Sequence, residues 1–182
     1  MPAGQERLLD FGVDFKPFGG HAKSASDRLR IGYIGQILPH KGVDLLVDAL
    51  AGLADQDGFE FKLYGSLSDP AEKQYFDSLN LARVRNAQWL GTFEVSEMNR
   101  VLQDIDLMVV PSRWAENCPL APKYALLTGT RLLVSDAPGI LLNSKPDAVR
   151  VFKTGDVNGL REKISELLAA GAWKKPAPSA RE

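Results

Sequence analysis

The segment from Asp106 to Gly129 holds the residues whose types and spacing point most clearly to chemistry. Its sequence, DLMVVPSRWAENCPLAPKYALLTG, predicts a short buried strand, a Pro-Ser turn, a loop that carries Glu116, and a helix that begins near Pro119. A helix start presents unpaired N–H groups to an anion, and a carboxylate accepts hydrogen bonds from hydroxyl groups. At the C-terminal end of a strand in an open α/β sheet, this combination is typical of a ligand site. A ligand with both phosphate and hydroxyl groups, such as a nucleotide sugar, suits that chemistry.

A second interpretation of the same spacing is that Glu116 caps the helix instead of binding a ligand. The sequence leaves both interpretations open. The residues that follow, Asn117, Cys118, Pro119 and Leu120, would form the helix start in either case. Cys118 is the only cysteine, so no internal disulfide can form, and we interpret it as a packing residue because no general base is recognisable beside it.

The turn GQILPHKG, from Gly35 to Gly42, is a second candidate for ligand chemistry. It matches neither the dinucleotide GxGxxG pattern nor a Walker P-loop. It nevertheless places glycines, Gln36 and Lys41 between a predicted strand and a predicted helix, where a lysine can supply a point charge to a phosphate. The alternative is a tight turn whose lysine lies in solvent.

Glycines also follow the next two predicted strands. Gly65 comes after one, and Gly91, Thr92 and Phe93 come after the other. A glycine at a strand end lets a ligand approach the backbone closely, although any one of them could be an ordinary turn residue. Their recurrence along one edge of a sheet favours a ligand cleft there.

Several other kinds of site are disfavoured. His21 and His40 have no partners at metal-ligand spacing, so we expect neither a metal nor another cofactor. Ser112 lies outside any GxSxG pattern, which argues against a hydrolase. We interpret Trp89 and Trp114 as core or rim packing residues.

Composition limits the class of protein. The chain has 182 residues and a net charge of -1, which suits one globular domain and gives no reason to expect nucleic acid as a partner. No apolar run approaches the roughly 20 residues that span a bilayer, and the first 20 residues lack the apolar segment of a signal peptide. We therefore expect a cytoplasmic protein.

Apolar runs of strand length alternate with segments of helical period, which predicts an α/β fold with a parallel sheet covered on both faces. The predicted strands are 29–35, 59–65, 87–91, 105–110, 131–135 and 148–152, and the predicted helices are 43–53, 70–79, 96–103, 119–127 and 157–170. Asp156 is the expected N-cap of the last helix. Residues 1–27 are predicted to be an extended lead-in, 28–170 the folded domain and 171–182 a loose tail.

In this order and spacing, the motifs resemble the C-terminal, donor-binding domain of GT-B glycosyltransferases of the glycosyl transferases group 1 family, whose members are retaining enzymes. The first matching segment is GVD at 12–14 with Phe18, and the second is the turn from Gly35 to KG at 41–42 with VDLLVDAL at 43–50. The others are WLG at 89–91, then Asp106 with PS at 111–112, EN at 116–117 and PL at 119–120, and finally Gly129 with SD at 135–136.

The resemblance implies a three-layer α/β/α Rossmann-like domain that binds a nucleotide-diphospho-sugar. Lys41 would neutralise the diphosphate and stabilise the leaving nucleoside diphosphate, and Glu116 would bind sugar hydroxyls. Backbone N–H groups of 118–120 would bind phosphate or sugar oxygens, and the backbone of 91–93 would border the base. No metal or other cofactor is implied.

Two site positions depart from the family pattern. Tyr124 stands where the family has a second glutamate for the ribose hydroxyls, and Gln36 stands where it has a basic residue. The segment after Gly139 is also shortened. These departures support an alternative hypothesis, a non-catalytic GT-B-like domain that serves as an interaction or structural module.

The family binds its acceptor in an N-terminal domain, for which this chain has no room. The resemblance therefore implies half of a two-domain enzyme, with any peripheral membrane association made through the missing half. A receiver-like α/β domain is disfavoured, because the first strand ends in Gly35 and Gln36 and offers no acidic cluster.

Overall fold

The computed structural model describes residues 23–117, 119–140, 148–171 and 173. The predicted lead-in and tail, the motif at 12–18 and Cys118 lie largely or wholly outside these residues. Six parallel strands form one sheet in the order β3-β2-β1-β4-β5-β6. The strands are β1 (Leu29–Ile34), β2 (Phe59–Tyr64), β3 (Ala87–Trp89), β4 (Leu107–Val110), β5 (Arg131–Ser135) and β6 (Val149–Phe152). The helices are α1 (Val43–Ala51), α2 (Pro70–Ser78), α3 (Met98–Gln103), α4 (Leu120–Leu127) and α5 (Val157–Ala170).

Every predicted strand and helix is therefore present. The predicted helix over 96–103 is a short 3-10 helix, Val95–Glu97, followed by α3. Asp156 caps α5 as expected, because its carboxylate accepts a hydrogen bond from the Gly159 amide at 2.9 Å.

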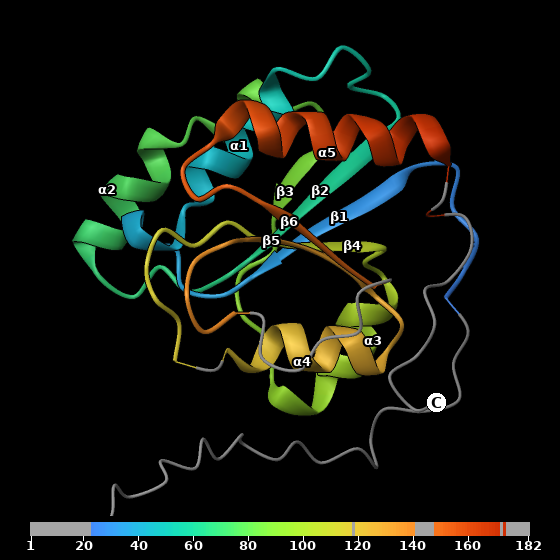
Figure 1. The fold of residues 1–182 in the computed structure, drawn as a ribbon. Coiled ribbons are helices and arrows are strands. Elements are labelled where there is room, and N and C mark those ends of the chain that lie inside the picture. Colours follow the sequence, from blue (N-terminus) through green and yellow to red (C-terminus); the bar gives the residue numbers. More distant parts are fainter. Residues whose placement is uncertain (1–22, 118, 141–147, 172, 174–182) are drawn as a thin grey trace, which may run out of the picture.

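The sheet is the middle of three layers (Figure 1). Helices α1 and α5 cover one face, and α3 and α4 cover the other. Each face has its own apolar core: Leu46, Phe59, Phe61 and Ile164 belong to the first, and Leu102 with Met108 belongs to the second. Because both faces are buried, strands such as β4, LMVV, are apolar throughout rather than alternating. The predicted three-layer fold is confirmed.

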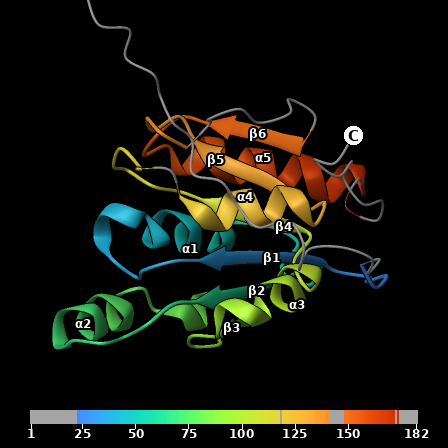
Figure 2. The same cartoon turned by 90° about the horizontal axis from the view of Figure 1, so that it is seen from below.

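The strand order fixes where a ligand can bind. From β1 the chain moves outward through β2 to β3, then returns to β4 on the other side of β1. The strands are parallel, and the arrowheads of β1, β2 and β6 point to the same side in Figure 2. The loop after β1 leads to α1 on one face of the sheet, and the loop after β4 leads to α4 on the other. In open α/β sheets such a switch point opens a crevice at the C-terminal edge.

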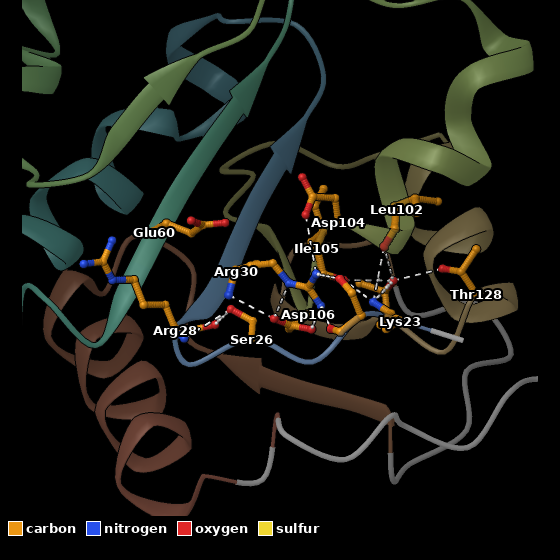
Figure 3. A network of polar contacts seen from close by, with 12 residues as sticks. Lys23, Ser26, Arg28, Arg30, Glu60, Leu102, Asp104, Ile105, Asp106 and Thr128 are labelled. Atoms are coloured by element: carbon orange, nitrogen blue, oxygen red, sulfur yellow. Dashed lines mark hydrogen bonds and ion pairs between the residues drawn. The ribbon is translucent and has the colours of Figure 1, made fainter. Parts of the chain in front are cut away.

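The opposite, N-terminal edge is held by a buried ion pair (Figure 3). The Arg30 guanidinium at the start of β1 donates from Nε to Asp106 Oδ2 at 2.9 Å and from Nη2 to Oδ1 at 2.7 Å. Both side chains are about 5% exposed or less. The Arg30 amide donates to the same carboxylate at 3.0 Å. This bidentate contact joins β1 to β4 at the point where the sheet order reverses.

Lys23 lies beside this pair. Its ammonium donates to Thr130 Oγ1 at 2.7 Å, to the Leu102 carbonyl at 3.2 Å and to the Ile105 carbonyl (Figure 3). Burial lowers the pKa of Lys23 from 10.5 to about 8, and the attraction of Asp106 only partly opposes this effect.

We expect the free energy of unfolding to rise between pH 7.5 and 9.5. The unfolded chain keeps the Lys23 proton up to its ordinary pKa of 10.5, whereas the folded chain releases it near pH 8. Stability therefore increases over this window, by about 1–2 kcal/mol, because the unfolded state binds more protons. Urea unfolding at the two pH values measures the change. Lys23→Met should abolish most of it, and an equal rise in that variant would contradict the assignment.

Candidate functional site

The structure brings Lys41 and Glu116 into direct contact. Lys41 ends a short 3-10 helix between β1 and α1, and Glu116 lies in the loop after β4. Lys41 Nζ is 2.9 Å from Glu116 Oε1 and 2.8 Å from Oε2. The two side chains are 23% and 10% exposed, so the pair is largely buried but reaches the surface. The interpretation in which Lys41 lies in solvent is wrong.

Glu116 does not cap the helix. Helix α4 has Pro119 as its N-cap and no side-chain cap hydrogen bond. The Glu116 carboxylate is instead occupied by Lys41 and by the Ser112 hydroxyl at 2.6 Å. The capping interpretation therefore fails, because these two side chains donate to the carboxylate and no side chain caps the first turn of α4.

The pair borders a hollow of about 200 Å³ at the switch point between β1 and β4. A second hollow of about 260 Å³ continues along the ends of β1, β2 and β3. Gly35 and Gln36 line both hollows, which therefore form one cleft along the C-terminal edge. Of the other predicted residues, Lys41, Glu116, Pro119 and Leu120 line the first hollow, and Gly65, Gly91, Thr92 and Phe93 line the second.

Two predicted residues lie apart from these hollows. Asn117 is exposed and lines neither hollow. Tyr124 is half-buried on α4, packs against the apolar core that contains Met98, and also lines neither. Its place beside a ribose stays a prediction. Cys118 lies outside the described residues.

The start of α4 offers fewer amide donors than the sequence analysis expected. Pro119 and Pro122 stand at the N-cap and third helical positions, and neither has an N–H group. The amides of Leu120 and Ala121 are the donors left in the first turn, and both residues line the first hollow. Among 118–120, therefore, Leu120 is the described residue that can donate an amide, and Ala121 adds a second donor.

Arg113 holds the turn that carries Lys41. Its amide donates to the His40 carbonyl at 2.8 Å, and its guanidinium donates to the Pro39 carbonyl at 2.9 Å. The same guanidinium binds both Asp44 oxygens at 2.7 and 2.6 Å. Burial alone would raise the pKa of Asp44, but the hydrogen bonds from Arg113 and Tyr75 lower it below its usual value. The ionised Asp44 therefore keeps Arg113 against the turn.

Tyr33 fixes the glycine turn from beneath the cleft. Its hydroxyl donates to the Gln36 carbonyl at 2.7 Å. Burial raises the pKa of Tyr33, and the nearby negative charge of Glu116 adds to the effect. The phenol therefore stays protonated and keeps this hydrogen bond throughout the physiological range.

Two tryptophans, Trp89 and Trp114, lie at the surface of the molecule. Trp114 is 66% exposed and meets the His40 ring edge-on at 6.3 Å between centroids. Trp89 is 42% exposed, and its Nε1 donates to the Gly65 carbonyl at 3.0 Å. Both are too exposed to be core residues, so core packing is wrong for them, and rim packing stays a prediction.

Sequence reasoning missed Ser112 and Arg113 as parts of this site. Ser112 was considered as a hydrolase nucleophile and as a motif position but was given no role in the site, and Arg113 was not considered. The available signal was their position, directly between the end of β4 and Glu116. Within 23–117, 119–140, 148–171 and 173, no group of three His, Cys, Asp or Glu side chains could hold a metal ion.

A search of the described helices for one long and apolar enough to cross a bilayer found none.

Comparisons with known proteins show the family to which the chain belongs. The family model "Glycosyl transferases group 1" matches residues 28–170. A soluble starch synthase 2-3 from Oryza sativa subsp. indica is 34% identical over 132 residues, which are 71% of this chain and 15% of the relative. The chain thus spans only a small part of that relative's length.

Solved structures show the same fold. Sucrose-phosphate synthase from Thermosynechococcus elongatus superposes with a TM-score of 0.81 at 25% identity, over 96% of this chain and 46% of that one. Anabaena HepE in complex with UDP-glucose gives a TM-score of 0.74 at 18% identity, over 90% of this chain and 48% of that one. The predicted fold of a GT-B domain is confirmed. With most of its length matched by the family model, the chain belongs to the Glycosyl transferases group 1 family.

Proposed function

We propose that this chain binds the nucleotide-diphospho-sugar donor for glycosyl transfer. The observation that carries the proposal is the contact between Lys41 and Glu116 at the switch point of the sheet, in a cleft that Leu120 and Ala121 also line. A cation, a carboxylate and two residues of a helix start beside one hollow match the phosphate and hydroxyl groups of such a donor. The UDP-glucose complex of HepE, a protein of the same fold, supports the class of ligand.

Lys41 can bind the diphosphate while it keeps its contacts with Glu116. A lysine ammonium has three N–H donors, and Glu116 accepts two hydrogen bonds from it. The third donor is available to a phosphate oxygen at the same place. As the bond between sugar and phosphate breaks, negative charge grows on that oxygen, and a cation already in position stabilises it.

Glu116 would then bind sugar hydroxyls through its remaining lone pairs, while the hollow beside Gly91 and Phe93 would receive the base. The retaining outcome and an acceptor-binding N-terminal domain are parts of the proposal that come from the family. We place the acceptor in that second domain, because the chain spans 15% of its starch synthase relative and 46% of the sucrose-phosphate synthase chain.

Calorimetric titration of the 182-residue chain tests the proposal. UDP, ADP and GDP are titrated separately, followed by the glucose form of each. We expect one nucleoside diphosphate to bind with a dissociation constant below about 1 mM, and Lys41→Ala to weaken it. If no member of the panel bound at millimolar concentration, the proposal would fail.

A non-catalytic interaction module is the second hypothesis that the departures from the family pattern suggest. Its clearest structural sign would be a cleft filled by Tyr124. In the part of the chain that the structure describes, Tyr124 packs on the apolar core of α3 and α4 and the cleft is open. We therefore favour donor binding.

Gln36→Arg should strengthen diphosphate binding. Gln36 is exposed and lines both hollows, so a guanidinium there would face the position proposed for the phosphates. A new charge-assisted contact at a partly solvated position should raise UDP affinity roughly five- to tenfold. Calorimetry at low salt measures the change. Gln36→Met, which adds no charge, is the control, and an equal gain in that variant would show that charge is not the cause.

A further inference from the structure

We propose that Ser112 is the positioning residue for the Glu116 carboxylate, and that it sets the part of donor affinity contributed by the sugar. Ser112 Oγ lies 2.6 Å from Glu116 Oε1. Ser112 is 1% exposed, so water does not compete for this contact. The inference rests on the proposed function, because it concerns the same cleft.

The hydroxyl proton of Ser112 is donated to Glu116. Oγ also lies 3.4 Å from the His40 carbonyl and 3.3 Å from the Trp114 carbonyl, but a hydroxyl has a single proton. The carboxylate is charged and much closer, so it is the stronger acceptor. Ser112 is thus a neutral donor to a carboxylate whose other side-chain donor is Lys41.

Donor binding makes this neutral contact more important. When the third donor of Lys41 binds a phosphate oxygen, the ammonium shares its attraction between phosphate and Glu116. The Ser112 contact is unaffected, because the hydroxyl is buried beneath the carboxylate. It therefore keeps Glu116 oriented for sugar hydroxyls when the ion pair is weakened.

Ser112 is itself fixed from β5. The Ser135 hydroxyl, in a residue that is 0% exposed, donates to the Ser112 carbonyl at 2.6 Å. Hydrogen bonds therefore run from Ser135 through Ser112 and Glu116 to Lys41, joining the ends of β5, β4 and β1. Because Ser135 belongs to this chain of contacts, the control is taken from the opposite edge of the sheet. Thr130 is 0% exposed there, and its hydroxyl lies 3.2 Å from the Leu102 carbonyl.

The test compares affinities for UDP-glucose and UDP, or for the ADP or GDP pair if that pair binds more tightly. The ratio of the two affinities isolates the sugar contribution. In Ser112→Ala we expect this ratio to fall about tenfold, because a hydrogen bond to a charged group is lost, while affinity for the diphosphate alone changes little. Ser112→Thr, which keeps the hydroxyl, should restore most of the ratio. Thr130→Val, which removes a buried hydroxyl at the opposite edge of the sheet, should lower the melting temperature but leave the ratio unchanged.

The outcomes separate the two proposals. If the unmodified chain binds no member of the panel, the proposed function fails and this inference fails with it. If the unmodified chain binds, the inference alone is overturned by any of three results: equal affinity for sugar nucleotide and diphosphate, an unchanged ratio in Ser112→Ala, or an equal loss in Thr130→Val. Thermal unfolding of each variant verifies that it is folded at the titration temperature.

Discussion

Asp106→Ala is expected to lower the free energy of unfolding by about 3–5 kcal/mol, because it leaves the Arg30 guanidinium buried with the half-exposed Asp104, at 3.4 Å, as its remaining described ion-pair partner. Arg30 is held by two hydrogen bonds from its side chain to Asp106, at 2.9 and 2.7 Å, and both residues are almost completely buried. The pair also joins the first strand of each half of the sheet. Urea unfolding followed by circular dichroism measures the loss.

A neighbouring carboxylate provides the control. Asp104 lies 3.4 Å from Arg30, but its side chain is 53% exposed. Asp104→Ala should therefore cost less than about 1 kcal/mol, as for other solvent-screened ion pairs. Replacing both partners, Arg30→Met with Asp106→Leu, should recover part of the stability because no unpaired buried charge remains. Equal losses in Asp106→Ala and Asp104→Ala would contradict this account of the N-terminal edge.

Gly42→Ala is the second substitution with a large expected effect. Gly42 has φ +73°, and a Cβ atom there would lie 2.0 Å from the Pro111 carbonyl oxygen. The strain and the backbone clash together should cost about 2–4 kcal/mol in the free energy of unfolding. Because Gly42 follows Lys41 directly, the turn must move away from the loop after β4. We therefore expect nucleotide affinity to fall as well.

Gly155→Ala separates the cost of a positive φ from the cost of a steric clash with the backbone. Gly155 has φ +80°, and a Cβ atom added there would meet nothing within 4 Å. It should show only the cost of a positive φ, roughly 1 kcal/mol, and no change in nucleotide affinity. Calorimetry and urea unfolding on both variants test this. A Gly42→Ala chain as stable as Gly155→Ala would show that the contact with Pro111 is not tight.

The strands and helices could be predicted from the sequence because the apolar runs of strand length and the helical spacing of apolar residues are both clear. Apolar runs such as LMVV in β4 mark buried parallel strands, and the pattern of 157–170 marks an amphipathic helix with its cap. Lys41 and Glu116 could be placed at the same sheet edge because each follows a strand, and parallel strands end at one edge. The alternation of strands and helices along the sequence does not give the order of the strands in the sheet. The direct contact between Lys41 and Glu116 depends on β4 lying beside β1, where the strand order reverses.

The rest of the site depends on contacts between segments far apart in the sequence. Nothing local indicates that Arg113 would bind Asp44, or that Ser112 would donate to Glu116. The buried Arg30–Asp106 pair is another example, because a charged residue at a strand start is ordinarily exposed. Tyr124 was assigned to the ribose by motif position, whereas its surroundings depend on how α4 packs against the core.

The most direct test of the central claim is the gain in affinity from UMP to UDP, or for the matching adenosine or guanosine pair, measured by calorimetry on the unmodified chain and on Lys41→Met. This gain reports the second phosphate, which we place against Lys41. We predict that Lys41→Met reduces the gain by about tenfold or more and leaves UMP affinity nearly unchanged. If the gain is the same in both proteins, the diphosphate does not lie at the Lys41–Glu116 pair and the proposed site is wrong.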